Sequence, residues 1–318
     1  MVARSYSLAI LAYPGCLQSA VLGLQDVLGY AASISEHSVA VETISTFVPG
    51  GRSFDALILP PSAAEVRAAD VPELPGYTAY QHGKGAVVCS ACTGVTFVAE
   101  AGIAAGRPVT THWGLEQRLS KRYPDMSFNT DQLLIEYSDL ITAGGLMAWV
   151  DLGLVVIERF LGYIVAARTA GYFIVDMRRR DQRRFRRFSP HLRHGDAAIL
   201  KSQHLIDARY ADVLSVKEIA SASGLPDRTF LRRFKAATGM TPNGYLQELR
   251  IERARGLLIE TGRTVSEICF AVGYQDPPSF SRLFTKLTGL TPNAFRKHFA
   301  RHDGQQKTPP IGGVLQRF

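Results

Sequence analysis

Two stretches of the chain, TFLRRFKAATGMTPNG at 229–244 and SFSRLFTKLTGLTPNA at 279–294, follow one pattern at a constant offset of 50 residues. They are identical at eight of their sixteen positions. Upstream lies a second pair, VKEIASASGL at 216–225 and VSEICFAVGY at 265–274, at an offset of 49. The one-residue difference falls in the turn between the segments. The chain therefore contains an internal repeat, and each copy is predicted to form two short helices joined by a turn.

The first copy has the pattern of a helix-turn-helix unit. Gly224 permits a sharp turn, and Asp227 is expected to cap the helix that follows. Phe230 and Phe234 are four residues apart and therefore face the core together. The positive side chains left on the outer face of this helix are Arg228, Arg232 and Lys235.

The second copy repeats this arrangement. Asp276 is the expected cap, and Phe280 and Phe284 are expected to face inward. The outer face carries Ser281, Arg282 and Lys286. In each copy a Thr-Pro pair, at 241–242 and at 291–292, predicts the start of a further helix, because proline is favoured at the first helical position.

A single helix of 19 residues is predicted between the two units, over 242–260. Its length is about 28 Å at 1.5 Å per residue. Such a rod could hold two recognition helices on successive major-groove faces of a DNA duplex, about 34 Å apart.

Charge is distributed unevenly along the chain. Residues 1–177 contain 10 Lys and Arg against 16 Asp and Glu, whereas residues 178–187 contain seven Arg and one Asp. Residues 188–318 contain 19 basic and 11 acidic residues, and the whole chain has a net charge of +8. An acidic front half joined to a basic rear half indicates one domain for a small partner and one for a polyanion.

Residues 203–300 resemble the C-terminal DNA-binding domain of the AraC/XylS family. The matching residues include Ile219, Gly224, Phe230, Gly239, Gly289, and the final AFRKHF. The resemblance implies that promoter DNA is contacted by Asp227, Arg228, Thr229, Leu231, Arg232, Lys235, Pro277, Pro278, Ser279, Ser281, Arg282 and Lys286. The two prolines cannot donate a hydrogen bond to a base edge, which leaves the second unit's sequence readout open. The alternative interpretation is a helical bundle whose charges are merely solvated.

The front half alternates strand-like and helical patterns. Short β-branched runs occur at 7–13, 39–45, 55–60, 85–91 and 107–113. Helical patterns lie at 18–33, 93–104 and 114–123, and a long helix is predicted over 146–177. Strands buried on both faces with helices between them predict a flavodoxin-like αβα sandwich with a mostly parallel sheet. The fold class is therefore α/β in front and all-α, with two helix-turn-helix units, behind.

Cys92 lies at a predicted strand-to-helix junction, in CSACTGVTF at 89–97. A thiol at a helix N-terminus has its thiolate stabilised by the helix dipole and by unpaired N–H groups. His112, at the end of the next predicted strand, is expected to reach it in a parallel sheet. The alternative is a satisfied structural histidine.

Residues 5–175 resemble the PfpI-type branch of the class I glutamine amidotransferase-like superfamily, through ACTGVTFVAEAG, GRPVTTHW and TAGGLMAWVDLGL. With the AraC-type domain, the chain resembles GlxA-type transcriptional regulators. Members with thiol chemistry carry a carboxylate on the first helix, where this chain has Ala20, with Gln18 nearby. The resemblance thus implies a non-enzymatic pocket for an amine or amino-acid-like effector, lined by Cys92, Thr93, Gly94 and His112.

Other roles for the front domain stay open. Cys92 could be the nucleophile of a hydrolase or glyoxalase-like enzyme, or could form a redox pair with Cys89. A structural protein with no ligand is a further class. Neither a cofactor nor a metal is expected, since the histidines and cysteines lack metal-ligand spacing.

The expected organisation is a sensor domain at 1–177, an Arg-rich linker at 178–200, a DNA-binding domain at 201–300 and a disordered tail at 301–318. Four irregularly spaced cysteines indicate a reducing compartment. The apolar run at 146–166 is interrupted by charged residues, which argues against a membrane span. We expect a cytoplasmic homodimer, joined through its N-terminal domain, and the resemblance implies activation rather than repression.

Overall fold

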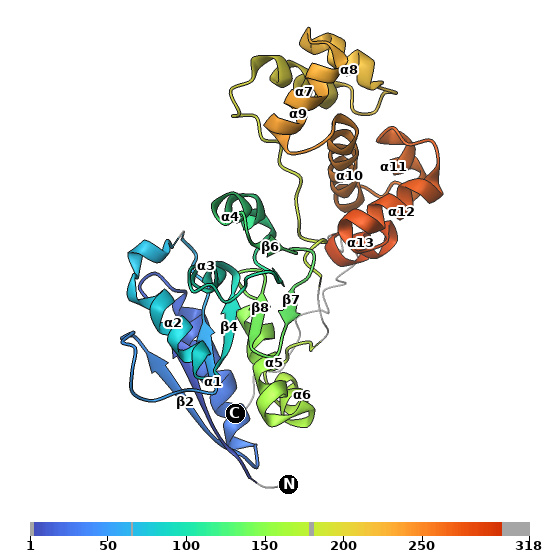
Figure 1. Ribbon diagram of the computed structural model, residues 1–318. Coiled ribbons are helices and arrows are strands. Elements are labelled where there is room, and N and C mark those ends of the chain that lie inside the picture. The colour runs from blue at the N-terminus through green and yellow to red at the C-terminus, as the bar shows by residue number, and fades with distance from the viewer. Residues whose placement is uncertain (1–2, 65, 178–180, 301–318) are drawn as a thin grey trace, which may run out of the picture. The chain divides into compact units, whose positions relative to one another are not determined.

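The computed structural model describes residues 3–64, 66–177 and 181–300 (Figure 1). The chain forms two compact units, Met1–Arg186 and Arg187–Phe318. Each unit is described by itself. The division falls inside the predicted linker, whose first three residues lie outside the described residues, as does the predicted disordered tail at 301–318.

The N-terminal unit is built on a six-stranded sheet. All neighbouring strands are parallel except the last pair, which is antiparallel. In spatial order the strands are β2 (Ser38–Ile44), β1 (Ser5–Leu11), β3 (Ala56–Leu59), β4 (Val87–Ala91), β8 (Leu140–Ala143) and β7 (Leu134–Glu136). The predicted mostly parallel sheet is confirmed.

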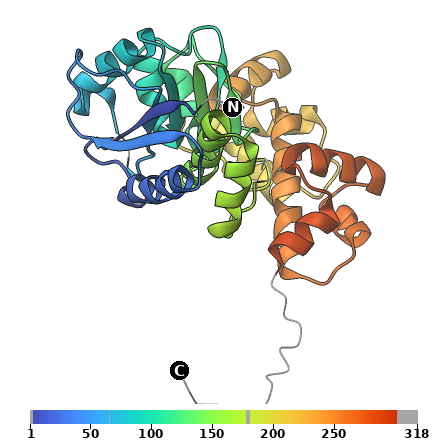
Figure 2. The same cartoon turned by 90° about the horizontal axis from the view of Figure 1, so that it is seen from below.

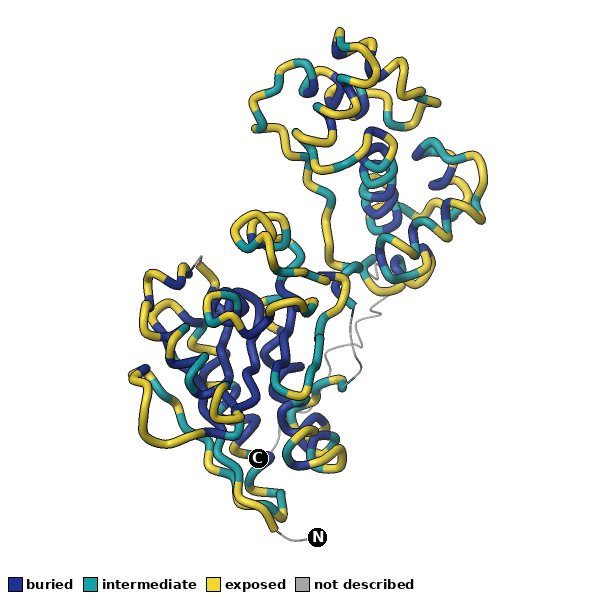
Figure 3. Tube along the Cα trace, in the orientation of Figure 1, coloured by how far each residue is buried: buried dark blue, intermediate teal, exposed yellow. Residues whose placement is uncertain are grey.

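Helices cover both faces of this sheet (Figure 2). The first face packs against α1 (Gln18–Ser33) and α5 (Trp149–Leu161), and α6 (Tyr163–Tyr172) packs on these two helices. The second packs against α2 (Glu73–Gly83) and α3 (Val95–Glu100). Because both faces are covered, the central strands β3, β4 and β8 are buried at every residue, whereas edge strand β2 is partly exposed (Figure 3).

Two sequence predictions for this unit were wrong. Of the strand expected at 107–113, only β5 (Pro108–Val109) forms, and it pairs with β6 (Ser127–Phe128) in a separate two-stranded sheet. Strand pairing stops there because the Thr110 N–H donates to the side-chain oxygen of Thr142, at 3.0 Å, instead of to a strand carbonyl. The position beside β4 is taken by β8, a strand that the sequence analysis did not predict.

The second wrong prediction is the single long helix over 146–177. The structure has two helices, α5 and α6, which meet at Gly162. Gly162 has a φ of +89°, which L-residues rarely adopt, and the helical path breaks there. Across the described residues, no helix has the length and apolar character needed to span a bilayer.

The C-terminal unit is helical in all the regular elements described for it. Its helices are α7 (Ala197–Ala208), α8 (Val216–Ser223), α9 (Asp227–Thr238), α10 (Pro242–Glu260), α11 (Val265–Ala271), α12 (Pro277–Thr288) and α13 (Pro292–Phe299). The pairs α8–α9 and α11–α12 are the two helix-turn-helix units. The long helix α10 has the bounds that the sequence predicted.

Two separate apolar cores lie along α10. Its first half places Tyr245, Leu246 and Leu249 in a core with α7, α8 and α9. Its second half places Ile251, Ala254 and Leu258 in a core with α11, α12 and α13. The inward-facing pairs Phe230–Phe234 and Phe280–Phe284 are completely buried, as predicted. One helix therefore holds both units in a single body.

Matching polar caps begin the helices of the two repeats. Ser215 with Glu218, and Thr264 with Glu267, each form a capping box at the first helix of a unit. Thr241, Thr291 and Asp276 each accept a hydrogen bond from a backbone N–H three residues on. The predicted cap at Asp227 was wrong, because Pro226 occupies the cap position and Asp227 is the first helical residue.

Candidate functional site

Cys92 lies at the sharp turn between β4 and α3. Its φ of +52° is unusual for a residue other than glycine and must be enforced by its surroundings. Thr111 Oγ1 donates a 2.8 Å hydrogen bond to the Cys92 carbonyl oxygen. Two residues further on, a Cβ at Gly94 would lie 2.8 Å from the carbonyl oxygen of Leu59. The turn is therefore packed directly against the end of strand β3.

The thiol of Cys92 is held in its neutral form. The residue is only 4% exposed, and burial raises its pKa. The backbone N–H groups of Thr93, His112 and Gly145 act in the opposite direction but do not reverse the shift. On helix α1, the fully buried Ala20 supplies no carboxylate at the position where the resemblance led us to look for one. The thiol is protonated at neutral pH, when it is a poor nucleophile.

Thr93 has a structural hydrogen-bonding role beside this turn. Its Oγ1 accepts a 2.6 Å hydrogen bond from the Ser62 N–H. Nearby, the Tyr13 hydroxyl donates to the Pro60 carbonyl oxygen, also at 2.6 Å. These bonds fix the loop after β3. Cys92, Thr93 and Gly94, three of the four predicted pocket residues, are buried inside the domain.

A cavity of about 300 Å³ lies next to this turn, and His112 is the predicted pocket residue on its wall. The other residues that line it come from four parts of the chain that no sequence pattern indicates as neighbours. They are Trp113, Leu133, Gly144, Gly145, Leu146, Met147, Ala148, Asp151, Gln182 and Phe185.

His112 faces this cavity as a neutral imidazole. Its Nδ1 accepts a 3.0 Å hydrogen bond from the Gly114 N–H, which a protonated ring nitrogen cannot do. Burial also lowers the pKa of His112. Its ring lies 5.0 Å from that of Trp113, centroid to centroid. The pair forms an aromatic wall without positive charge.

Asp151 supplies the carboxylate of the cavity. It lies in the first turn of α5, where the helix dipole favours a negative charge, and it is only 7% exposed. Trp113, Met147 and Phe185 give the cavity its mostly apolar wall. The available signal in the sequence was this acidic residue inside the apolar run at 146–166. A charge in such a run argues against a membrane span, and it can also mark a binding site.

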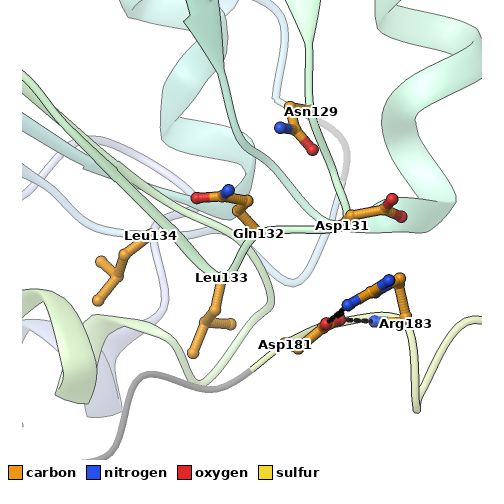
Figure 4. Close-up of a pocket in the computed structure, with 7 residues that line it drawn as sticks. All are labelled: Asn129, Asp131, Gln132, Leu133, Leu134, Asp181 and Arg183. Carbon is orange, nitrogen blue, oxygen red and sulfur yellow. Dashed lines mark hydrogen bonds and ion pairs between the residues drawn. The ribbon is translucent and has the colours of Figure 1, made fainter. Parts of the chain in front are cut away.

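A second hollow, of about 390 Å³, has Leu133 in common with this cavity (Figure 4). It is open and polar, and its wall includes Asn129, Asp131 and Gln132. Asp181 and Arg183 form an ion pair across one side of it. Among the described residues no cluster of three or more His, Cys, Asp or Glu side chains could hold a metal ion.

The first recognition helix, α9, presents a basic outer face. Arg228, Arg232 and Lys235 are exposed while the two phenylalanines of the helix are buried. A fourth cation, Arg233, is instead paired with Asp196 at the start of α7, through nitrogen–oxygen distances of 2.7 and 2.9 Å. That ion pair fixes α9 against α7. Asp227 and Leu231 are also exposed, and Thr229 is half-buried.

The second recognition helix, α12, has a less positive outer face. Pro277 and Pro278 form its first turn, and Arg282 and Lys286 are exposed. Arg282 Nη2 donates a 2.7 Å hydrogen bond to the hydroxyl of Ser279, one turn earlier. This contact orients the guanidinium along the helix. Of the remaining predicted DNA-contacting residues, Ser279 is exposed and Ser281 is half-buried.

Comparisons with known proteins give separate matches for the front and the rear parts of the chain. The DJ-1/PfpI family model matches residues 26–159, and a helix-turn-helix domain model matches residues 219–298. The HTH-type transcriptional regulator ArgR of Pseudomonas aeruginosa is 27% identical over 213 residues, which are 67% of this chain and 64% of that protein. The HTH-type transcriptional regulator CdhR of the same species is 27% identical over 206 residues, 64% of this chain and 61% of that protein.

One solved structure is of a transcriptional regulator from Chromobacterium violaceum described as having an AraC-type DNA-binding domain. It is 31% identical, with a TM-score of 0.32, and covers 33% of this chain and 94% of that one. The chain spans less than two thirds of the length of the two curated relatives above. The chain is thus similar to the DJ-1/PfpI family over its front part and to helix-turn-helix domains over its rear part.

Proposed function

We propose that this protein is a sequence-specific DNA-binding transcriptional regulator controlled by a small-molecule effector bound in its N-terminal domain. The observation that carries the proposal is the pair of helix-turn-helix units on one long helix, each with exposed cations on its second helix. The names of the similar regulators support it. Access to promoter DNA implies a cytoplasmic location.

The two units are suited to different kinds of contact. In the first, Arg228 and Arg232 can each pair with a guanine edge, and Lys235 can pair with a phosphate. In the second, Arg282 is the base-reading candidate, and the prolines can contact thymine methyl groups only through apolar surface. We therefore expect the first unit to supply most of the sequence discrimination.

The cavity beside His112 is the proposed effector site. The negative charge of Asp151 favours a cationic group in the cavity, and the Trp113 ring offers a π face to a cation. A volume of about 300 Å³ is at the lower end of the usual range for small-molecule pockets. These features support an amine or an amino-acid-like effector.

A thiol-dependent enzyme is the alternative that the DJ-1/PfpI domain raises. The buried Cys92 thiol and its raised pKa favour a binding role over nucleophilic catalysis. A redox pair of Cys89 and Cys92 is also disfavoured, because Cys89 lies inside β4 and is fully buried. We infer that the domain senses a ligand and does not turn one over.

We also propose that the protein is a homodimer joined through its N-terminal domain. Exposed apolar side chains gather on and just after α6, namely Tyr163, Ile164, Tyr172 and Ile174. Exposed apolar groups concentrated on one element are typical of a protein–protein interface.

The DNA-binding half of the proposal is tested with the full chain. Its binding sites are first selected from fragmented genomic DNA, and affinities are then measured at several salt concentrations. We expect Arg232→Ala to weaken binding to the selected site by about 1–3 kcal/mol, or roughly 5- to 150-fold. Arg4→Ala, which removes an exposed arginine just before β1, is the matched control. Equal affinities of the two variants would contradict the proposal.

The effector half is tested by thermal shift. Amino acids, amides and quaternary amines are screened against the full chain and against Asp151→Asn. We expect cationic compounds to stabilise the parent protein and to lose that effect in the variant, since the carboxylate is replaced by a neutral amide. If a cationic compound stabilises both proteins equally, it binds outside the cavity that Asp151 lines.

A further inference from the structure

The last six residues of the N-terminal unit, 181–186, form a segment that we call the strap. It is part of the arginine-rich run, yet it is docked against the domain. Asp181 forms an antiparallel β-bridge with Gln132. The Gln182 N–H donates to the Asp131 carbonyl oxygen at 3.1 Å. The described part of the run is therefore not simply a solvated linker.

The side chain of Gln182 anchors the strap. It is only 3% exposed, among seven arginines within ten residues. Its Nε2 lies within hydrogen-bond distance of three oxygens, which are Thr110 Oγ1 at 3.2 Å, the Thr111 carbonyl at 2.9 Å and the Gln132 carbonyl at 3.0 Å. An amide nitrogen carries two hydrogens, so all of its donor capacity is used in this recess.

The recess exists because residue 144 has no side chain. A Cβ at Gly144 would lie 1.9 Å from Gln182 Nε2 and 2.6 Å from the Thr111 carbonyl oxygen. No side chain could fit there without expelling the glutamine. Gly144 and Gln182 are thus complementary in shape, which is a second observation independent of the hydrogen bonds.

The strap is also part of the cavity wall. Gln182 and Phe185 line the proposed effector site, together with Gly144. Any molecule that fills this cavity therefore touches the segment that leads directly into the next unit. Release of the strap would remove two of the residues that enclose the cavity.

The chain after the strap is anchored to the other unit. Arg187 Nη1 pairs with a carboxylate oxygen of Glu252 on α10 at 2.8 Å, and the Phe188 N–H donates to the other oxygen at 3.3 Å. His194 Nε2 lies 2.8 Å from the side-chain oxygen of Gln203 on α7. The division between the units therefore falls directly at the end of the strap.

We propose that the strap is a releasable tether whose docking sets how far the two units can move apart. Release would free six residues, and an extended chain spans at most about 3.3–3.6 Å per residue, so the reach between the units would grow by about 20 Å. A ligand that contacts Gln182 and Phe185 favours the docked state, because it binds that state better than the released one. This last step rests on the proposed effector site.

The test uses Gln182→Glu in the full chain. A carboxylate cannot donate to the three oxygens around it, and its charge is repelled by them, so the strap should leave its recess. Gln117→Glu, on the exposed surface of α4 (Glu116–Arg122), makes the same chemical change outside the strap. Hydrogen exchange of peptides covering 181–186 should become about tenfold or more faster in Gln182→Glu and stay unchanged in the control.

The tether itself is measured by the distance between two spin labels, at Ala105→Cys and Ala294→Cys, which are exposed positions in different units. The four native cysteines are buried and free, so labelling is selective for the introduced ones. We expect Gln182→Glu to broaden the distance distribution toward separations up to about 20 Å longer. Unchanged exchange and unchanged distances would overturn the proposal.

Gln182→Ala provides a second route to the same result, because it removes the anchoring amide and introduces neither a charge nor a clash. It should reproduce both effects, and circular dichroism establishes that each variant is folded. If Gln182→Glu unfolds, Gln182→Ala alone decides the outcome. Neither measurement uses DNA or an effector, so failure here is distinguishable from failure of the proposed regulatory function.

Discussion

Removing the ring of Phe284 should unfold the second helix-turn-helix unit and spare the first. Phe284 is completely buried in the core formed by α11, α12, α13 and the second half of α10. Its ring centroid lies 5.8 Å from that of Phe280 and 5.4 Å from that of Phe295. Phe284→Ala therefore loses apolar burial and two aromatic contacts, and it leaves a cavity.

The expected loss is about 3–5 kcal/mol. The free energy of unfolding of a whole domain is about 5–15 kcal/mol. The second unit has a core of only nine buried residues, so this loss should leave it marginally stable or unfolded. Phe270→Ala removes the same ring from α11, where it is 57% exposed, and should change stability by less than about 1 kcal/mol.

The assay is hydrogen exchange on the full-length variant, followed by peptides from each helix. Peptides from α11, α12 and α13 should lose protection, whereas those from α7, α8 and α9 should keep it, because the two cores have only α10 and the Tyr210 side chain in common. Equal loss in both sets would refute the reasoning, since it would show that α10 couples the cores into one cooperative unit. So would a Phe284→Ala variant as stable as Phe270→Ala.

Three further predictions concern the N-terminal unit. Burial raises the pKa of the Cys92 thiol, so its alkylation at pH 7, followed by mass spectrometry, should be slower than that of a free cysteine. The alkylation rate should increase only when the pH exceeds the usual pKa of a thiol. Fast alkylation at pH 7 would instead support the enzyme alternative. Burial lowers the pKa of His112 in the folded state, so as the pH falls the unfolded chain binds the proton before the folded chain does. The free energy of unfolding in urea should therefore decline from pH 7 to pH 5. The decline should be smaller in His112→Gln. Ile164 is 74% exposed on α6, and Ile164→Asp should convert the dimer to a folded monomer, with the mass measured by light scattering. An unchanged mass would show that the interface lies elsewhere.

Many of the elements could be predicted because their signals are local. The helices at 242–260 and 18–33 have the predicted bounds. Both were predicted from the spacing of apolar residues, and the first also from its Thr-Pro start, and these signals lie within a few residues of one another. The caps at Thr241, Thr291 and Asp276 were predicted for the same reason. Asp227 failed as a cap because Pro226 already occupied the position before the helix.

The candidate pocket was predictable only at one residue, His112. Cys92 was correctly placed at the strand-to-helix turn, but the turn directs it into the domain and not toward the cavity. The other residues of the wall are Trp113, Leu133 and residues of the loop after β8, the start of α5 and the strap. Nothing in the sequence near any one of them indicates the others, because they meet only when the sheet is assembled.

The sequence by itself determined the class of the protein. The repeat, the two phenylalanine pairs and the asymmetric charge predict two helix-turn-helix units behind an α/β domain, since each signal depends on spacing along the chain. The tertiary structure alone decided that β8 lies beside β4, and that a glutamine among arginines fills the space left by Gly144. Those outcomes depend on contacts between residues that are 38 to 72 positions apart, where strand pairing and steric fit, and not local pattern, select the partner.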